Sequence, residues 1–174
     1  MGDEVWYATI VGVIVLSGLS IFYILYLAKM RRTKTNAAWK QAATELGLDF
    51  TPVTRIFGKY RMSGVIGKQL SCSVWAYTEP NGQGGYTTFM NYDVRFPQRL
   101  NKVKELLTPN IQSKLLEVNN VLKKVVVSDD SINSTRVSGF IRKSEILIQN
   151  VKLLIQLAEL IIPNEEVDSI FEEI

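Results

Sequence analysis

Residues 5–28 read VWYATIVGVIVLSGLSIFYILYLA, an uncharged and largely apolar stretch near the start of a chain of 174 residues. A helix of this length rises about 36 Å, because each residue adds about 1.5 Å, and the hydrocarbon core of a bilayer is about 30 Å thick. Aromatic rings favour the membrane interface, and near the ends of the stretch lie Trp6, Tyr7, Tyr23 and Tyr26. We therefore predict one transmembrane helix over residues 5–28.

The charges that flank this stretch predict its orientation. Residues 1–4 end in Asp3 and Glu4, whereas a basic segment follows Ala28. Because Lys and Arg are enriched on the cytoplasmic side of membrane helices, we expect a single-pass protein of the cell membrane with residues 1–4 outside and the rest in the cytoplasm. A cleaved signal peptide is the main alternative, but its positive charge would precede the apolar segment.

The basic segment, residues 29–36, is interpreted as a polar linker at the membrane surface. We predict that its cations contact anionic lipid headgroups; they are Lys29, Arg31, Arg32 and Lys34. The excess of basic over acidic residues extends beyond this segment, since residues 29–104 contain thirteen Lys and Arg and four acidic residues. The alternative is that the first four cations only fix the topology. Nucleic-acid binding is not expected, because no recognisable binding motif is present and the chain carries an anchor.

Small residues within the predicted span indicate a helix-packing surface. Ala8 and Gly12 are four residues apart, and Gly18 lies between Ser17 and Ser20. Such patches let two membrane helices approach closely. Small residues are also common in membrane helices that pack against nothing, which leaves that alternative open.

Residues 37–162 are predicted to form one α+β domain with an antiparallel sheet packed by helices. A helix is expected over residues 37–46, with Trp39 on its apolar face and Gly47 as its C-cap. Residues 49–96 are rich in β-branched and aromatic residues and contain glycine-rich turns, which predicts three or four strands. Apolar side chains alternate between Leu70 and Tyr77, which places Cys72 on the same face of a strand as Val74.

The second half of the domain shows helix signals and one short strand. Thr108 and Pro109 are a typical N-cap and first helical residue, and this helix is expected to end near Val118 or Asn120. Residues 125–127 predict a short strand that pairs with residues 136–140. Apolar residues at spacings of three and four predict a long helix over residues 143–162, which Pro163 ends.

Residues 163–174 form an acidic segment with apolar residues at helical spacing. Val167, Ile170 and Phe171 are predicted to form the apolar side of a short helix that binds a partner protein. A frayed acidic terminus is the alternative.

The composition leaves few kinds of catalytic site. The chain has no histidine and one cysteine, which excludes histidine-dependent triads, histidine-ligated metal centres and an internal disulfide. Cys72 has no histidine to activate it, so we expect a structural role. We expect no cofactor, no metal and no enzymatic activity, although chemistry by carboxylates or lysines stays open.

One motif and the pattern after it resemble known sequences. The motif is WKQAATELGL at residues 39–48, and it is followed by a predicted strand and by glycines at positions 58, 64 and 67. The chain resembles uncharacterised prokaryotic domains that open with W-x-x-x-A-x-x-L-G-L and continue into a glycine-punctuated sheet, over most of residues 37–162. The resemblance implies an α+β fold and a prokaryotic source, and it implies no activity or site residues.

These features together favour a membrane-anchored accessory subunit or scaffold whose cytoplasmic domain binds other proteins. The alternative is a tethered binding module that holds a lipid or another apolar ligand between the sheet and the helix over residues 143–162.

Overall fold

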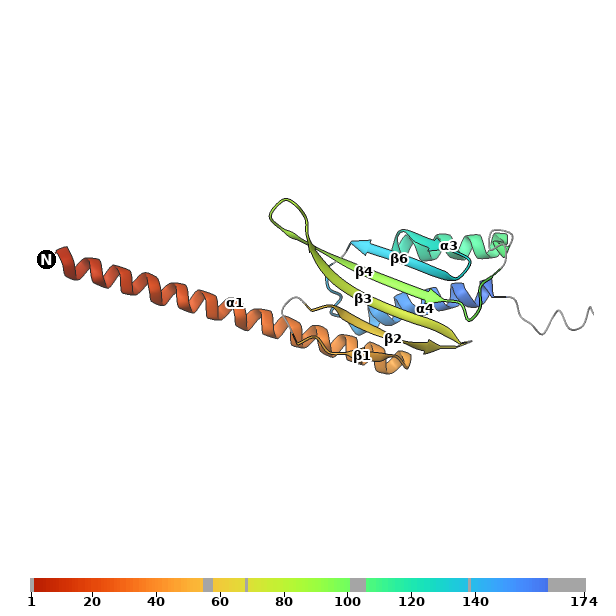
Figure 1. The fold of residues 1–174 in the computed structure, drawn as a ribbon, viewed down its shortest axis with the longest axis horizontal. Coiled ribbons are helices and arrows are strands. Elements are labelled where there is room, and N and C mark those ends of the chain that lie inside the picture. Colours follow the sequence, from red (N-terminus) through yellow and green to blue (C-terminus); the bar gives the residue numbers. More distant parts are fainter. Residues whose placement is uncertain (1, 55–57, 68, 101–105, 138, 163–174) are drawn as a thin grey trace, which may run out of the picture.

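The computed structural model describes residues 2–54, 58–67, 69–100, 106–137 and 139–162 (Figure 1). It confirms an α+β fold in which a long N-terminal helix leads into an antiparallel sheet packed by helices. The predicted partner segment at Val167, Ile170 and Phe171 lies outside the described residues.

Helix α1 spans Gly2–Leu46 without a break, and it has two distinct parts. The first part stands away from the domain, and none of the residues in its most apolar window is buried. The second part packs into the domain, where Trp39, Ala42 and Ala43 are buried. Among the described residues, α1 is the one helix that is long and apolar enough to cross a membrane by length and composition.

The helix expected over residues 37–46 begins earlier than predicted, because residues 29–36, the predicted linker, are helical as well. Lys, Arg and Met are good helix formers, and residues 19–46 contain neither glycine nor proline. The hydroxyls of Thr33 and Thr35 donate to the carbonyls of Lys29 and Arg31, at 3.1 and 2.9 Å, which satisfies these polar groups within the helix. The chain therefore passes from the predicted span into the domain as one helix.

The C-terminus of α1 follows the predicted capping pattern. Gly47 has a φ of +68°, a conformation that glycine adopts without strain. The amide of Gly47 donates to the carbonyl of Thr44 at 3.3 Å, and the amide of Leu48 donates to the carbonyl of Ala43 at 2.8 Å. These two bonds form a Schellman motif, which ends the helix and turns the chain into the first strand.

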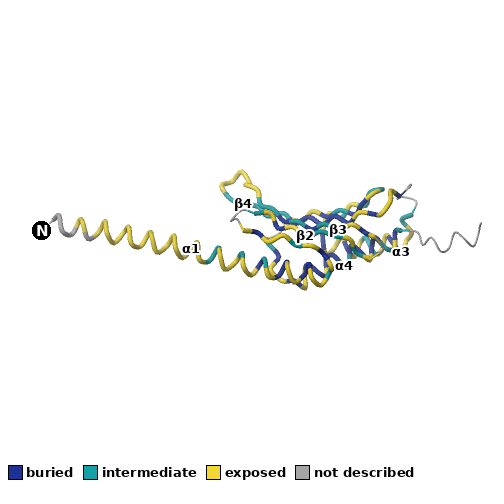
Figure 2. Tube along the Cα trace, turned by 60° about the horizontal axis from the view of Figure 1, so that its bottom comes forward, coloured by how far each residue is buried: buried dark blue, intermediate teal, exposed yellow. Residues whose placement is uncertain are grey.

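The sheet has six antiparallel strands in the order β1-β2-β3-β4-β6-β5, in which β5 is Val125–Val127 and β6 is Ser131–Val137. Three or four strands are expected between residues 49 and 96, and the structure has four: β1 Asp49–Thr51, β2 Tyr60–Ile66, β3 Leu70–Pro80 and β4 Tyr86–Arg95. Figure 2 shows the strands along one side of the domain and the helices along the other, with the buried residues between them. The sheet therefore has one face covered by helices and one outer face that they leave uncovered.

The predicted alternation in β3 is confirmed. Leu70, Cys72, Val74 and Ala76 are buried, whereas the residues between them are intermediate or exposed. Burial raises the pKa of the Cys72 thiol to about 12, and the negative charge of Asp93 contributes less. A buried, protonated thiol is a weak nucleophile.

Because the pKa of the Cys72 thiol is raised, we expect the free energy of unfolding to fall at alkaline pH. In the unfolded chain the thiol ionises near its ordinary pKa of 9.0, whereas in the folded chain it stays protonated to about pH 12. The unfolded state then binds fewer protons, so the free energy of unfolding falls as the pH rises above about 9. We expect a loss of about 1–2 kcal/mol by about pH 10.5 in chemical denaturation. Cys72→Ala should have a shallower pH dependence, and an unchanged slope would contradict the assignment.

Helix α3 spans Pro109–Leu122 and begins at the predicted cap. The Thr108 hydroxyl accepts a hydrogen bond from the amide of Ile111 at 3.4 Å, and Pro109 occupies the first turn. The helix continues slightly beyond the predicted end, because Val118 and Leu122 are both buried in the core.

The strand that pairs with β5, Val125–Val127, is β6, Ser131–Val137, and not residues 136–140. A tight turn explains the difference. The Ser128 amide donates to the Ser131 carbonyl at 2.9 Å, so the chain reverses at once and Val127 lies opposite Ile132. Strand β6 also pairs with β4, which brings β5 and β6 into the main sheet.

Helix α4 spans Ser144–Ile161, within one residue of the predicted helix at each end. Its apolar face forms the centre of the core, where Leu147, Val151, Leu154, Leu157 and Ala158 are fully buried. Two buried residues of this helix, Ser144 and Asn150, are polar. Asn150 donates from Nδ2 to the hydroxyl of Tyr92 at 2.9 Å, which joins α4 to β4 inside the core.

Candidate functional site

One end of the domain faces the direction in which α1 leaves it. Figure 1 shows the hairpin between β3 and β4 pointing to that side. The register explains this, since Tyr60 at the start of β2 lies opposite Ala76, and β3 and β4 extend beyond that pair to Pro80 and Tyr86. Val137 ends β6 at the same side, opposite Phe89. We call this region the α1-exit end of the domain.

A pocket of about 370 Å³ lies at this end, where α1 meets the domain. Three elements supply its walls: α1, the start of β2, and the loop between β6 and α4. The lining residues are Leu25, Ala28, Lys29, Arg31, Arg32, Thr35, Tyr60, Phe140 and Arg142. Four of these nine residues are cationic and none is acidic. We call it the junction pocket.

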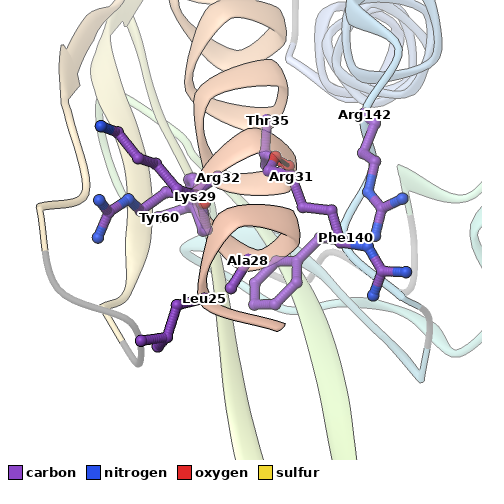
Figure 3. A pocket seen from close by; sticks show the side chains of 9 residues that line it. All are labelled: Leu25, Ala28, Lys29, Arg31, Arg32, Thr35, Tyr60, Phe140 and Arg142. Carbon is purple, nitrogen blue, oxygen red and sulfur yellow. Dashed lines mark hydrogen bonds between the residues drawn. The ribbon is translucent and has the colours of Figure 1, made fainter. Parts of the chain in front are cut away.

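The cations of the junction pocket lie on two sides of α1. Figure 3 shows Arg31 and Arg142 extending to one side, beside the ring of Phe140. Lys29 and Arg32 extend to the other side, together with Tyr60. The pocket therefore combines positive charge with aromatic and aliphatic surface.

Three of these cations have no anionic partner within the described part of the chain. The ion pairs there involve other residues, and Lys29, Arg31 and Arg142 form none. Arg32 is held differently, because its Nη1 donates to the carbonyl of Thr54 at 2.6 Å. Like charges repel, so an anion would relieve the repulsion among these side chains.

The pKa of the Tyr60 phenol depends on its burial and on the cations of the pocket. Desolvation by burial raises the pKa of Tyr60, while the hydrogen bond with Thr35 and the charges of Arg32 and Arg142 oppose that shift. The phenol therefore stays protonated near neutral pH. It offers the pocket a neutral hydroxyl beside guanidinium groups.

The structure separates the predicted surface cations into two groups. Lys29, Arg31 and Arg32 line the junction pocket, whereas Lys34 does not. No pattern in the sequence indicates that Tyr60, Phe140 and Arg142 join them, because they lie far from the basic segment along the chain. Two contacts hold Phe140 and Arg142 there. Trp39 Nε1 donates to the Ile141 carbonyl at 3.2 Å across 102 residues, and the ring of Phe140 lies 5.1 Å from that of Tyr60, measured between centroids.

The outer face of the sheet is a second candidate surface. Tyr77 and Phe89 stack there, with ring centroids 5.3 Å apart, and Trp75 lies opposite Asn91 in the register. Asn91 is only 7% exposed and accepts a hydrogen bond from the Thr135 hydroxyl at 2.7 Å. Its Nδ2 is buried and has no hydrogen-bond partner among the described residues. This face is therefore aromatic near the α1-exit end, and elsewhere it carries polar side chains together with the exposed Val65 and Val126.

The carboxylates of Asp93 and Asp130 have partners within the fold. Asp93 pairs with Arg95 at 2.9 Å, and Asp130 accepts from the Ser128 hydroxyl at 2.8 Å within the β5–β6 turn. Within the described ranges, no group of three or more Asp, Glu, Cys or His side chains is arranged to hold a metal ion.

The predicted helix-packing residues lie on the part of α1 that stands apart from the domain. A Cβ atom added at Gly12 or Gly18 would meet nothing within 4 Å. Ala8 lies in the same helix, and its side chain is outside the described part. Their role in helix packing stays a prediction, since it needs a second helix.

No protein-family model matches the sequence, and comparisons with curated proteins and with solved structures find no match.

Proposed function

We propose that the protein is a single-pass membrane-anchored accessory subunit or scaffold, with its N-terminus outside and its domain in the cytoplasm. The observation that carries the proposal is the continuity of α1. One helix contains both the apolar segment and the buried residues Trp39, Ala42 and Ala43. A domain joined to its anchor in this way has a fixed position relative to the bilayer, which suits the presentation of a surface to a neighbouring protein.

The orientation is supported by the charges at the two ends of the span. Asp3 and Glu4 precede it, and the pocket cations Lys29, Arg31 and Arg32 follow it directly. The positive side of a membrane helix faces the cytoplasm. The domain would therefore lie in a reducing compartment, which agrees with a free and buried Cys72.

The outer sheet face is the surface we assign to a partner protein. Aromatic side chains are enriched in protein interfaces, and Trp75, Tyr77 and Phe89 are each only partly buried here. In the proposed complex the partner would cover these rings.

The proposal is tested by gentle detergent extraction of the native protein, followed by identification of the proteins retained in fixed ratio. We expect a defined membrane complex. The double variant Trp75→Ala/Tyr77→Ala should lose the partner while it stays in the membrane fraction. Leu116→Ala is the matched control, because Leu116 is an exposed apolar residue on α3. A monodisperse monomer at native abundance would count against the proposal.

The alternative of an apolar ligand beneath α4 gains no support from the packing. The side chains that would line such a cavity, including Leu147, Leu154 and Leu157, are fully buried in one cluster with sheet residues. We therefore carry the protein-binding proposal forward.

A further inference from the structure

We infer that the junction pocket is a binding site for the headgroup of an anionic phospholipid. The inference rests on the proposed membrane anchoring, because the pocket would then lie at the level of the headgroups. Its lining includes Leu25 and Ala28, which belong to the last turns of the predicted span. The site is thus continuous with the surface that would face the lipid chains.

Charge is the first argument for this ligand. Arg31 and Arg142 come from separate elements and extend to the same side of α1 (Figure 3). Neither has an ion-pair partner among the described residues. Two guanidinium groups with free donors match the oxygens of a phosphate group, which they can bind by charge-assisted hydrogen bonds.

The apolar wall is the second argument, and it distinguishes a lipid from a free anion. The ring of Phe140 lies beside the two guanidinium groups, and the half-exposed side chain of Leu25 lies on the membrane side of the pocket. A free phosphate would use the cations and leave this apolar surface in water. A phospholipid would place its phosphate at the cations and its glycerol and acyl chains along Leu25 and Ala28.

The third argument is that the pocket is held in place by the fold. Helix α1 carries Arg31, and the hydrogen bond from Trp39 to the Ile141 carbonyl fixes the residue next to Arg142 against the same helix. Arg32 is held by the Thr54 carbonyl on the other side. The backbone positions that carry the cations are thus fixed before a ligand arrives, which lowers the part of the entropic cost of binding that comes from ordering the chain. This arrangement differs from a mobile basic tail, which would attract any anionic surface.

The experiment uses the full chain in mild detergent, titrated with phosphatidylglycerol or phosphatidylcholine and examined by native mass spectrometry. We expect retention of one phosphatidylglycerol per chain and weaker retention of phosphatidylcholine, whose choline cation repels the pocket. The variant Arg31→Gln/Arg142→Gln should bind phosphatidylglycerol about 30-fold more weakly, since each cation near a headgroup contributes about 1 kcal/mol. Both side chains are exposed, so this variant should fold.

The matched control is Lys40→Gln/Lys124→Gln, which removes the same charge from exposed positions outside the pocket. It should change the affinity by less than about threefold. Equal losses in the two variants would overturn the site in favour of diffuse attraction. Equal binding of both lipids, or displacement of phosphatidylglycerol by inorganic phosphate, would overturn the lipid assignment. Membrane anchoring is measured separately, by alkaline extraction of membranes. If α1 spans the bilayer, both variants should stay in the membrane fraction, whatever their affinity for phosphatidylglycerol.

Discussion

Replacing Trp39 by alanine is expected to lower the free energy of unfolding of the domain by about 3–5 kcal/mol, the range typical of a large core aromatic cut to alanine. Trp39 is fully buried and is among the largest side chains in the core. Its ring lies 5.5 Å from that of Tyr60 and 6.4 Å from that of Phe50, measured between centroids. The variant would lose this packing and leave a cavity between α1 and the sheet.

The same substitution also removes a long-range hydrogen bond. Trp39 Nε1 donates to the Ile141 carbonyl, which holds the loop before α4 against α1. Because domains of this size have unfolding free energies of about 5–15 kcal/mol, the loss would be a large share of the total. The free energy of unfolding of both proteins is measured by chemical denaturation in detergent, monitored by circular dichroism.

The control for this prediction is Trp75→Ala, which removes the same side chain from the outer sheet face. Trp75 is only partly buried. Its loss should cost less than about 1.5 kcal/mol, since it leaves no enclosed cavity. Equal destabilisation by the two substitutions would show that Trp39 does not anchor α1 in the core.

The substitution Thr33→Pro is expected to break the rigid connection between the apolar part of α1 and the domain. Thr33 is exposed and lies between the span and the first buried residue of the described part of α1, Thr35. Proline there lacks the amide that would bond to the carbonyl of Lys29, and its ring clashes with that carbonyl. The cost in a helix interior is about 3 kcal/mol, which a local kink relieves.

The measurement is the distance distribution between spin labels at Ile21 on the apolar part of α1 and at Gln149 on α4. Both positions are exposed, and the buried Cys72 should not react with the label. The native chain should give one narrow distribution, whereas Thr33→Pro should give a broad or shifted one. Thr33→Ala keeps the backbone donor and should leave the distribution narrow. A narrow, unshifted distribution in the proline variant would contradict a rigid connection.

The junction pocket shows why sequence patterns find only part of a site. The basic residues after the apolar stretch are adjacent in sequence, so the sequence alone is enough to predict that they act together. Arg142 and Phe140 reach the pocket through tertiary contacts, among them the hydrogen bond from Trp39 to the Ile141 carbonyl and the packing of Phe140 against Tyr60. A contact across 102 residues has no local signature, since it depends on how α1, the sheet and α4 pack together.

Local patterns were enough to predict the features that neighbouring residues control. These features are the uncharged stretch over residues 5–28, the alternation in β3, the Thr108 cap and the glycine at the end of α1. The helical state of residues 29–36 depends on both levels, because their helix-forming residues permit a helix and contacts in the packed domain stabilise it. Asn36 favours the helix by contacts that exist only in the folded chain. Its side chain accepts from the Val53 amide at 3.1 Å and donates to the Val53 carbonyl at 3.0 Å, which fixes this part of α1 to the chain that follows β1.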